Sequence, residues 1–258
     1  MVRLTRPGVL GRNVRAFEST WPRQCVPSLD ALTRGCVGRR IVDTGRRGKH
    51  GLFHLDDGSR LMIHFRMSGR LAFADVDEPM HNHARAVWTL DDGRRLLLVD
   101  PRKWARIRLV TNPDDLDAGL GPEPLAESFT ALVLGAQLSR TARAIKAALL
   151  DQSLIAGLGN IYTDEALFRA RIHPETPARE IRHARLVDLH AAIQAVLFEG
   201  IENMGTSIDW IYPGGKMQDK LLVYGRSGEP CVVCGTPIEK TRVAQRGTHS
   251  CPRCQGRA

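Results

Sequence analysis

Two Cys-x-x-Cys pairs near the end of the chain constrain the fold more than any other feature. The first pair is Cys231 and Cys234, the second is Cys251 and Cys254, and sixteen residues separate the two pairs. Each pair offers two thiolates from one short turn, which suits the tetrahedral coordination of a structural zinc ion. Two redox dithiols are the alternative, but two matched pairs favour zinc. Since the segment is too short to fold around an apolar core of its own, we expect one zinc ion to hold a hairpin together.

Basic charge gathers around these cysteines. The chain has 37 Lys and Arg residues against 28 Asp and Glu residues, a formal net charge of +9, and residues 216–258 hold eight basic residues against three acidic ones. Such clustering favours an extended polyanion as the partner, although a basic surface can also serve solubility alone. The side chains of the expected hairpin that suit phosphate or groove contacts are Arg242, Gln245, Arg246, Thr248 and His249.

The rest of the composition indicates a globular protein of the cytoplasm. Hydrophobic residues make up 43% of the chain and charged residues 25%, which are ordinary proportions for such a protein. No apolar run approaches the ~20 residues of a membrane helix, and the N-terminus lacks the apolar stretch of a secretory signal. We therefore expect a cytoplasmic protein without membrane contact, in which Cys25 and Cys36 are free thiols.

The pattern of apolar residues changes along the chain. From residue 13 to residue 110, short apolar segments alternate with turn signals, and the tripeptide Asp-Asp-Gly occurs at 56–58 and 91–93. Each occurrence predicts a hairpin whose glycine has a positive φ, and strands at this spacing predict a β-sandwich or barrel. Residues 111–125 are rich in Pro, Gly and Asp, which indicates a linker. Beyond the linker, helical periodicity predicts helices at 142–150, 161–170 and 179–201.

A glycine-rich corner precedes the second of these helices. Asn160 can cap the helix, while Gly157 and Gly159 allow a partner to approach the backbone closely. Free amides at such a helix start form a phosphate site, although an ordinary corner between two helices has the same pattern.

Two loops of the β region carry side chains that suit contact with DNA bases. The segment "FRMSGRL" places Met67 in a tight turn, and "DPRKWARI" places Arg102 and Trp104 in another. An apolar side chain and an arginine at loop tips suit insertion next to an extruded nucleotide, although Met and Trp are more often core residues. Lys49 in "RRGKHGLF" opens a strand, where it can contact a phosphate or a reacting sugar, or simply face solvent.

Taken in order, these segments resemble the formamidopyrimidine-DNA glycosylase / endonuclease VIII family of base-excision repair enzymes. The segments that carry the resemblance are "RRGKHGLFHL", "IHFRMSGRL", "DPRKWARI", "LGPEPL", "GLGNIYTDEALF" and "VYGRSGEPCVVCGTPIEK". The resemblance implies an α+β multidomain protein with a β-sandwich at residues 1–115, a helix–two-turn–helix domain at 116–212 and a zinc-ribbon β-hairpin at 213–258. It also implies a monomer that binds double-stranded DNA at oxidised or abasic sites in the nucleoid.

Residue roles follow from the same resemblance. Lys49 resembles the catalytic lysine of the family, and Glu165 matches a glutamate beside its active site. Met67 and Arg102 resemble residues that fill the space left by the extruded base, with Trp104 where the family usually has Phe. The residues expected to grip DNA phosphates are Lys146, Asn160 and Arg246, beside Gln245 in the hairpin loop.

The start of the chain departs from the family pattern. In the family, an N-terminal proline amine attacks the sugar to form a Schiff base, and the following Glu serves as the acid. This chain opens with "MVRLTRPGVLGRNV" instead, and three hypotheses compete. The true start lies upstream, or Val2 supplies the N-terminal amine with Arg3 in place of the Glu, or the chain binds damaged DNA without glycosylase chemistry.

The resemblance thus implies a DNA glycosylase with AP lyase activity that removes oxidised bases such as 8-oxoguanine and formamidopyrimidines. A non-catalytic protein that binds damaged DNA is the alternative. A ribosomal or transcriptional zinc ribbon would leave "GLGNIYTDEALF" and "DPRKW" unexplained. The loop before "VYGR" is shorter than in the purine-acting enzymes of the family, whereas Met67 and Arg102 favour that branch.

Overall fold

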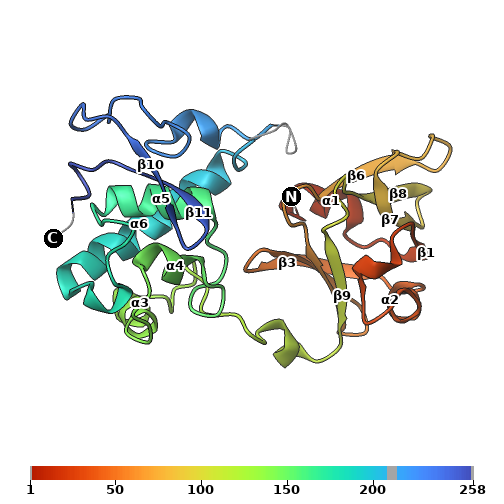
Figure 1. Ribbon diagram of the computed structural model, residues 1–258. Helices are drawn as coiled ribbons and strands as arrows, with labels where there is room; N and C mark the ends of the chain where they lie inside the picture. The colour runs from red at the N-terminus through yellow and green to blue at the C-terminus, as the bar shows by residue number, and fades with distance from the viewer. Residues whose placement is uncertain (1, 208–213, 257–258) are drawn as a thin grey trace. The chain divides into compact units, whose positions relative to one another are not determined.

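The computed structural model describes residues 2–207 and 214–256 (Figure 1). The chain divides into two compact units, Met1–Ala118 and Gly119–Ala258, each with a hydrophobic core of its own. The boundary between them falls inside the segment 111–125 that the sequence indicates as a linker, whereas the expected boundary at 212 and 213 lies outside the described residues. Within the described ranges, no helix combines the length and the apolar character needed to cross a membrane.

The first unit is built from two sheets. Hydrogen bonds order the four-stranded sheet as β1-β7-β8-β6, and its strands are β1 (Val14–Ser19), β6 (Arg70–Asp75), β7 (Ala84–Leu90) and β8 (Arg94–Val99). The five-stranded sheet has the order β2-β9-β5-β4-β3, and its strands are β2 (Cys25–Val26), β3 (Ile41–Arg47), β4 (His50–Leu55), β5 (Arg60–His64) and β9 (Arg106–Val110). β2 pairs with β9 in parallel, and the other described pairs are antiparallel.

Apolar side chains of the two sheets meet in one core. Phe53 and Leu61 from the five-stranded sheet and Trp88 and Leu98 from the four-stranded sheet are all buried. The rings of Phe53 and Trp88 meet edge to face, with their centroids 6.5 Å apart. Buried side chains from both sheets belong to one cluster, and the predicted sandwich is confirmed.

Both hairpins predicted from the Asp-Asp-Gly turns are confirmed. β4 pairs with β5 around Gly58, which has a φ of 84°, and β7 pairs with β8 around Gly93, which has a φ of 82°. Since only glycine adopts this conformation without strain, the two glycines fix the register of both hairpins.

Two short helices complete the first unit. They are α1 (Val2–Val9) and α2 (Leu29–Cys36). The prediction that residues 13–110 are all β is wrong at α2, because eight residues are too few for a helical period to stand out. The available signal was Ser28, whose hydroxyl accepts a hydrogen bond from the Ala31 amide at 3.1 Å and caps the helix. Cys25 and Cys36 are buried free thiols, and burial raises the pKa of Cys36 to about 12.

The second unit combines helices with a two-stranded hairpin. Its elements are α3 (Ala131–Leu138), α4 (Ile145–Leu150), α5 (Asn160–Arg169), α6 (His183–Glu202), β10 (Glu239–Val243) and β11 (Arg246–Ser250). Short 3-10 turns in the two units are η1 (Pro22–Gln24), η2 (Pro113–Leu116), η3 (Ala178–Glu180) and η4 (Met217–Lys220). β11 lies against α5 (Figure 1).

Three predicted helix starts differ from the structure. α4 begins at Ile145 because Ala144 is paired in a β-bridge with Pro177. α6 begins at His183 because the residues before it form η3. α5 begins at Asn160 with Gly159 in the capping position, so the prediction that the Asn160 side chain caps the helix is wrong.

Candidate functional site

The four cysteines of the two Cys-x-x-Cys pairs converge at one point. Their Sγ atoms all lie within 4.8 Å of one another, with Cys231 and Cys254 at 3.9 Å and Cys234 and Cys251 at 3.5 Å. Sulfurs around a tetrahedral zinc ion at ~2.3 Å lie about 3.8 Å apart, so these residues fit the ion. The amides of Val233 and Cys254 each donate to a sulfur two or three residues earlier, at 3.4 Å, which suits thiolate ligands. The cysteine cluster therefore forms one structural zinc site.

The β10–β11 hairpin presents three of the five predicted DNA-binding side chains. Its turn residues Ala244 and Gln245 have φ values of 47° and 63°, a left-handed pair that matches the twist of a tight hairpin. Arg242, Gln245 and Arg246 are exposed, whereas Thr248 and His249 are buried. The prediction that Thr248 and His249 project from the loop is wrong, because this end of β11 is packed on α5.

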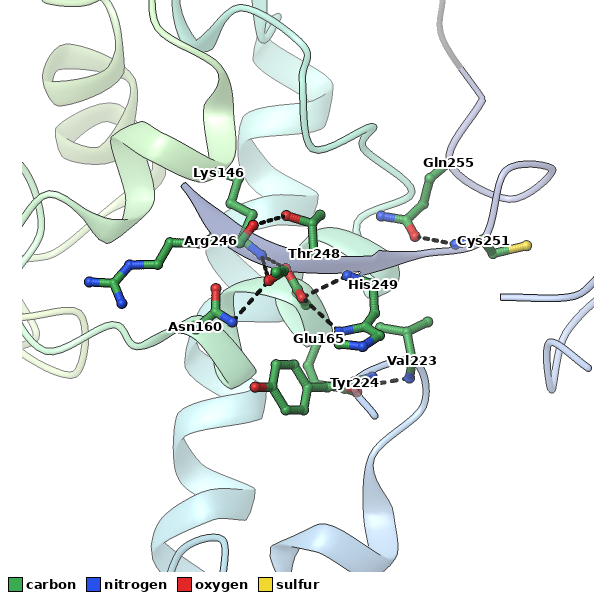
Figure 2. Close-up of polar contacts among 12 residues, drawn as sticks. Lys146, Asn160, Glu165, Val223, Tyr224, Arg246, Thr248, His249, Cys251 and Gln255 are labelled. Carbon is green, nitrogen blue, oxygen red and sulfur yellow. Dashed lines mark hydrogen bonds and ion pairs between the residues drawn. The ribbon is translucent and has the colours of Figure 1, made fainter. Parts of the chain in front are cut away.

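A buried polar network holds β11 on the helices (Figure 2). The Lys146 ammonium of α4 lies 2.6 Å from the Asp164 carboxylate of α5 and donates to the Gly247 carbonyl at 2.8 Å. The Asn160 amide donates to the same carbonyl at 3.0 Å. The Asp164 carboxylate in turn accepts the His249 backbone N–H at 2.9 Å. α4 and α5 thus hold two consecutive peptide groups of β11, just after Arg246.

Lys146 is a positioning residue in this network. Its side chain and that of Asp164 are both 0% exposed. Burial lowers the pKa of Lys146, and the neighbouring Asp164 opposes that shift. The ammonium holds the Asp164 carboxylate and the Gly247 carbonyl, and the direct phosphate contact expected of Lys146 stays a prediction.

Glu165 also serves the architecture of the second unit. Its buried carboxylate accepts the backbone N–H groups of Leu222, Val223 and Tyr224 at 2.9 Å, 3.0 Å and 2.9 Å. Figure 2 shows Glu165 beside Val223 and Tyr224. These peptides precede the first cysteine pair in the chain, so Glu165 anchors the segment that leads to the zinc site. With both oxygens engaged by amides, the carboxylate holds the backbone, and its predicted place beside reacting atoms stays a prediction.

The start of α5 opens on a small pocket. Its lining residues are Gly157, Gly159, Asn160, Ile161, Tyr162 and Thr206. Gly157 has a φ of 92°, and a Cβ placed on Gly159 would meet no other atom within 4 Å, so the backbone here faces open space. The Asn160 amide keeps a second N–H beside the one given to Gly247. Free amides at a helix start together with this N–H suit a phosphate oxygen.

Two loops of the first unit carry large exposed side chains at their tips. Met67 in the loop after β5 is 59% exposed, and Trp104 in the loop after β8 is 49% exposed. The Arg102 guanidinium lies over the Trp104 ring, 4.7 Å from its centroid. Met and Trp are more often core residues, but the exposure of Met67 and Trp104 excludes a core role for both.

Lys49 lies in the turn between β3 and β4 and is half-buried there. His50 follows it and faces His64 across the β4–β5 pair, with ring centroids 4.7 Å apart. Burial, aided by His50, Arg66 and Lys49, lowers the pKa of His64 to about 4, so this imidazole is neutral at pH 7. The two histidines were not among the residues predicted from the sequence. The register of the Gly58 hairpin was the signal, because a turn that pairs Leu55 with Ser59 also pairs His50 with His64.

Val2 lies in the first turn of α1, near this lysine. A Cβ placed on Gly51 would come within 2.2 Å of the Val2 side chain, so Val2 packs directly on β4 two residues beyond Lys49. The start of α1 and the Lys49 turn therefore occupy the same corner of the first unit. The catalytic role of Val2 stays a prediction.

Three family models match the chain. The formamidopyrimidine-DNA glycosylase N-terminal domain matches residues 1–107, the formamidopyrimidine-DNA glycosylase H2TH domain matches residues 120–211, and the zinc finger found in FPG and IleRS matches residues 228–256. A sandwich, a helical domain and a zinc hairpin in this order define a class of DNA-repair glycosylase.

Individual relatives agree with these models. The formamidopyrimidine-DNA glycosylase of Symbiobacterium thermophilum is 45% identical over 96% of this chain and 84% of its own length, and that of Chloroflexus aurantiacus is 43% identical over 99% and 94%. The crystal structure of the Lactococcus lactis enzyme with FAPY-dG-containing DNA has a TM-score of 0.92 and 36% identity, with 99% of this chain and 97% of that chain covered. A complex of the same enzyme with DNA that contains an abasic site has a TM-score of 0.92 and 35% identity, again with 99% of this chain and 97% of that chain covered. The chain belongs to the formamidopyrimidine-DNA glycosylase family.

Proposed function

We propose that this chain is a base-excision repair DNA glycosylase with AP lyase activity, which removes oxidised bases from double-stranded DNA. The observation that carries the proposal is the pairing of two features in the first unit. One is a corner with an amine, Lys49, and the other is a pair of loop tips that expose Met67 and Trp104. A reactive amine suits sugar chemistry, and exposed wedges suit the extrusion of a base that must precede it.

The loop tips would act first. Met67 and the stacked Arg102 and Trp104 would enter the duplex where the damaged nucleotide leaves it. An apolar side chain replaces the lost stacking, while the guanidinium can donate hydrogen bonds to the base that loses its partner. Unstacking costs a few kcal/mol, and damaged pairs cost least, which gives the tips a first level of selectivity.

The amine would act on the exposed sugar. Attack of an unprotonated amine at C1′ breaks the bond to the base, which leaves with a proton. Loss of a proton from the new amine then opens the sugar ring at O4′ and gives an imine, from which elimination releases the 3′-phosphate and then the 5′-phosphate. Two amines are candidates, Lys49 and the N-terminal amine of Val2, which lie in the same corner. His64 adds no positive charge at neutral pH because its pKa is about 4, so it does not repel the cationic imine.

The second unit would hold the phosphates around the lesion. Arg246 and Gln245 are exposed at the zinc-held hairpin, and the amides at the start of α5 lie with Asn160 beside an open pocket. Lys146 and Glu165 would act indirectly, by fixing the strand and the segment that carry these contacts. We place this monomeric activity in the cytoplasm, in contact with the nucleoid.

Oxidised purines, 8-oxoguanine and formamidopyrimidines, are the substrates we propose. Solved relatives are complexes with DNA that contains FAPY-dG and carbocyclic 8-oxo-G, which supports this choice. The second candidate is a protein that binds damaged DNA without cleaving it.

Trapping with sodium borohydride should separate the two candidates. Full-length protein with a duplex containing 8-oxoguanine should give a covalent adduct, because borohydride reduces the imine to a stable amine. Mapping of the adduct by mass spectrometry should find it on the N-terminal peptide or on Lys49. A Lys49→Ala variant should lose the adduct if Lys49 is the nucleophile, and should keep it if the N-terminal amine is.

Lys240→Ala is the matched control, since Lys240 is an exposed lysine on β10. It should trap as the parent protein does. Specific binding of the damaged duplex with neither an adduct nor a strand break would contradict the glycosylase and support the non-catalytic candidate.

A further inference from the structure

Asp100 is a buried carboxylate that joins the two loop tips. It follows β8 directly and is 0% exposed. Its Oδ1 accepts the Ser68 hydroxyl and, at 3.3 Å, the Arg102 amide, and its Oδ2 accepts the Ala105 amide at 2.7 Å. Ser68 belongs to the loop of Met67, whereas Arg102 and Ala105 belong to the loop of Trp104. One side chain thus bonds to both loops.

The sheet topology explains why these loops meet. The loop after β5 passes from the five-stranded sheet to the four-stranded sheet, and the loop after β8 passes back in the opposite direction. β6 pairs with β8 through Arg70 and Val99, and β5 pairs with β9 through His64 and Arg106. The loops after β5 and β8 are therefore held side by side at one end of the sandwich, and the Ser68–Asp100 hydrogen bond links them.

Both tips are also held in unusual backbone conformations. Arg66 and Lys103 have φ values of 54° and 59°, which non-glycine residues adopt only when their surroundings hold them. The Arg66 amide donates to the His64 imidazole at 2.9 Å, and the Lys103 ammonium lies 4.6 Å from the centroid of the Trp21 ring. Specific contacts thus hold both loops in these conformations.

We propose that the Ser68–Asp100 hydrogen bond makes the two loops a single preformed wedge, with Ser68 and Asp100 as positioning residues for base extrusion. The inference rests on the proposed function, because it assigns Met67, Arg102 and Trp104 to the space left by the base. Asp100 is well suited to this task, since its three partners are neutral donors and it meets them through both oxygens. Loops that are already ordered do not have to lose conformational freedom when they enter the duplex.

Ser68→Ala is the sharpest test, because it removes only the bond between the loops. The rate of single-turnover excision of 8-oxoguanine should fall by roughly 10- to 100-fold, the scale expected when a positioning group shifts by about 1 Å. Strand cleavage at a preformed abasic site should change by less than about threefold, since no base has to be extruded. Ser68→Thr keeps a hydroxyl and should restore excision. Asp100→Asn offers one acceptor oxygen in place of two, so it also disturbs the bonds to the Arg102 and Ala105 amides, and its excision rate should fall at least as far as that of Ser68→Ala.

Ser59→Ala is the matched control. Ser59 is also buried and donates its hydroxyl to a carboxylate, that of Asp57 at 2.6 Å, but it lies in the β4–β5 turn. Its loss should leave both rates near those of the parent protein. Thermal unfolding of each variant identifies any that fail to fold.

Extrusion itself is measured by the fluorescence of 2-aminopurine placed next to the lesion. Ser68→Ala should slow the rise in fluorescence that the parent protein produces. If the parent protein extrudes the base without cutting the strand, the glycosylase proposal fails while this signal still tests the link. The inference is overturned if Ser68→Ala leaves excision and fluorescence unchanged, or if it slows lesion and abasic substrates equally.

Discussion

A Lys146→Met variant should lose about 3–5 kcal/mol of the free energy of unfolding, the cost of leaving a buried charge without its partner. Lys146 and Asp164 are both fully buried and lie 2.6 Å apart, and the ammonium also holds the Gly247 carbonyl. Removal of the ammonium would leave the buried Asp164 carboxylate with the His249 backbone amide at 2.9 Å and the His249 Nδ1 at 3.6 Å, and without a cationic lysine beside it. Urea unfolding of the full chain, followed by circular dichroism, measures the loss.

Two further variants show whether the loss of stability comes from the buried ion pair. Lys240→Met removes an exposed lysine of β10 and should stay within about 0.5 kcal/mol of the parent protein. The double variant Lys146→Met/Asp164→Leu removes both charges and should regain much of the loss, since an apolar pair can replace a buried ion pair. A Lys146→Met protein as stable as the parent would contradict the assignment of Lys146 to the buried network.

The salt dependence of DNA binding distinguishes a buried lysine from a phosphate contact. Removal of one phosphate contact lowers the slope of log affinity against log salt concentration by about 1. Arg246→Gln should therefore lower that slope, whereas Lys146→Met, measured where it is folded, should leave it unchanged. A lower slope for Lys146→Met would support the direct phosphate contact predicted from the sequence.

Loss of zinc should have the second large effect. Cys251→Ser, or prolonged treatment with a chelator, should release the ion and unfold the β10–β11 hairpin, because zinc binding supplies ~10–16 kcal/mol to domains of this kind. Arg246 and Gln245 would then lose their fixed positions. The affinity for damaged duplex should fall by at least about 100-fold, the equivalent of two lost hydrogen bonds to charged phosphates. Metal analysis and a binding titration on the same sample measure both changes.

Cys25→Ala is the matched control for the zinc ligands. Cys25 is a buried thiol of the first unit and lies outside the cysteine cluster. It should keep one zinc ion per chain and the affinity of the parent protein. Cys251→Ser protein that still binds one zinc ion and the damaged duplex with parental affinity would contradict the structural role of the metal.

Features set by residues close in sequence could be predicted well. The spacing of the cysteines predicted the zinc cluster, and the Asp-Asp-Gly turns predicted the β4–β5 and β7–β8 hairpins. In each case a short stretch contains the whole cause, either the four ligands or a glycine that needs a positive φ. The exposed loop tips followed from the same kind of local signal, with the core alternative excluded only by the structure.

Features that depend on distant partners could not be predicted. Lys146 has its carbonyl partner at Gly247, far along the chain, so nothing near Lys146 revealed its burial. The same holds for Glu165, whose amide partners begin at Leu222. A lysine or a glutamate in a DNA-binding protein suggests contact with the ligand, and only tertiary structure shows that these two hold the backbone.

Photo-crosslinking at a lesion tests most directly the claim that the loop tips and the zinc hairpin act on one damaged nucleotide. Benzoylphenylalanine would replace Trp104 in one protein and Arg246 in another, with a third carrying it in place of Arg34, an exposed residue of α2. On a duplex with a single 8-oxoguanine, the first two should crosslink to nucleotides next to the lesion, and the third should not. Crosslinks from position 104 or 246 that are spread evenly along the duplex, or that match those from position 34, would contradict the account.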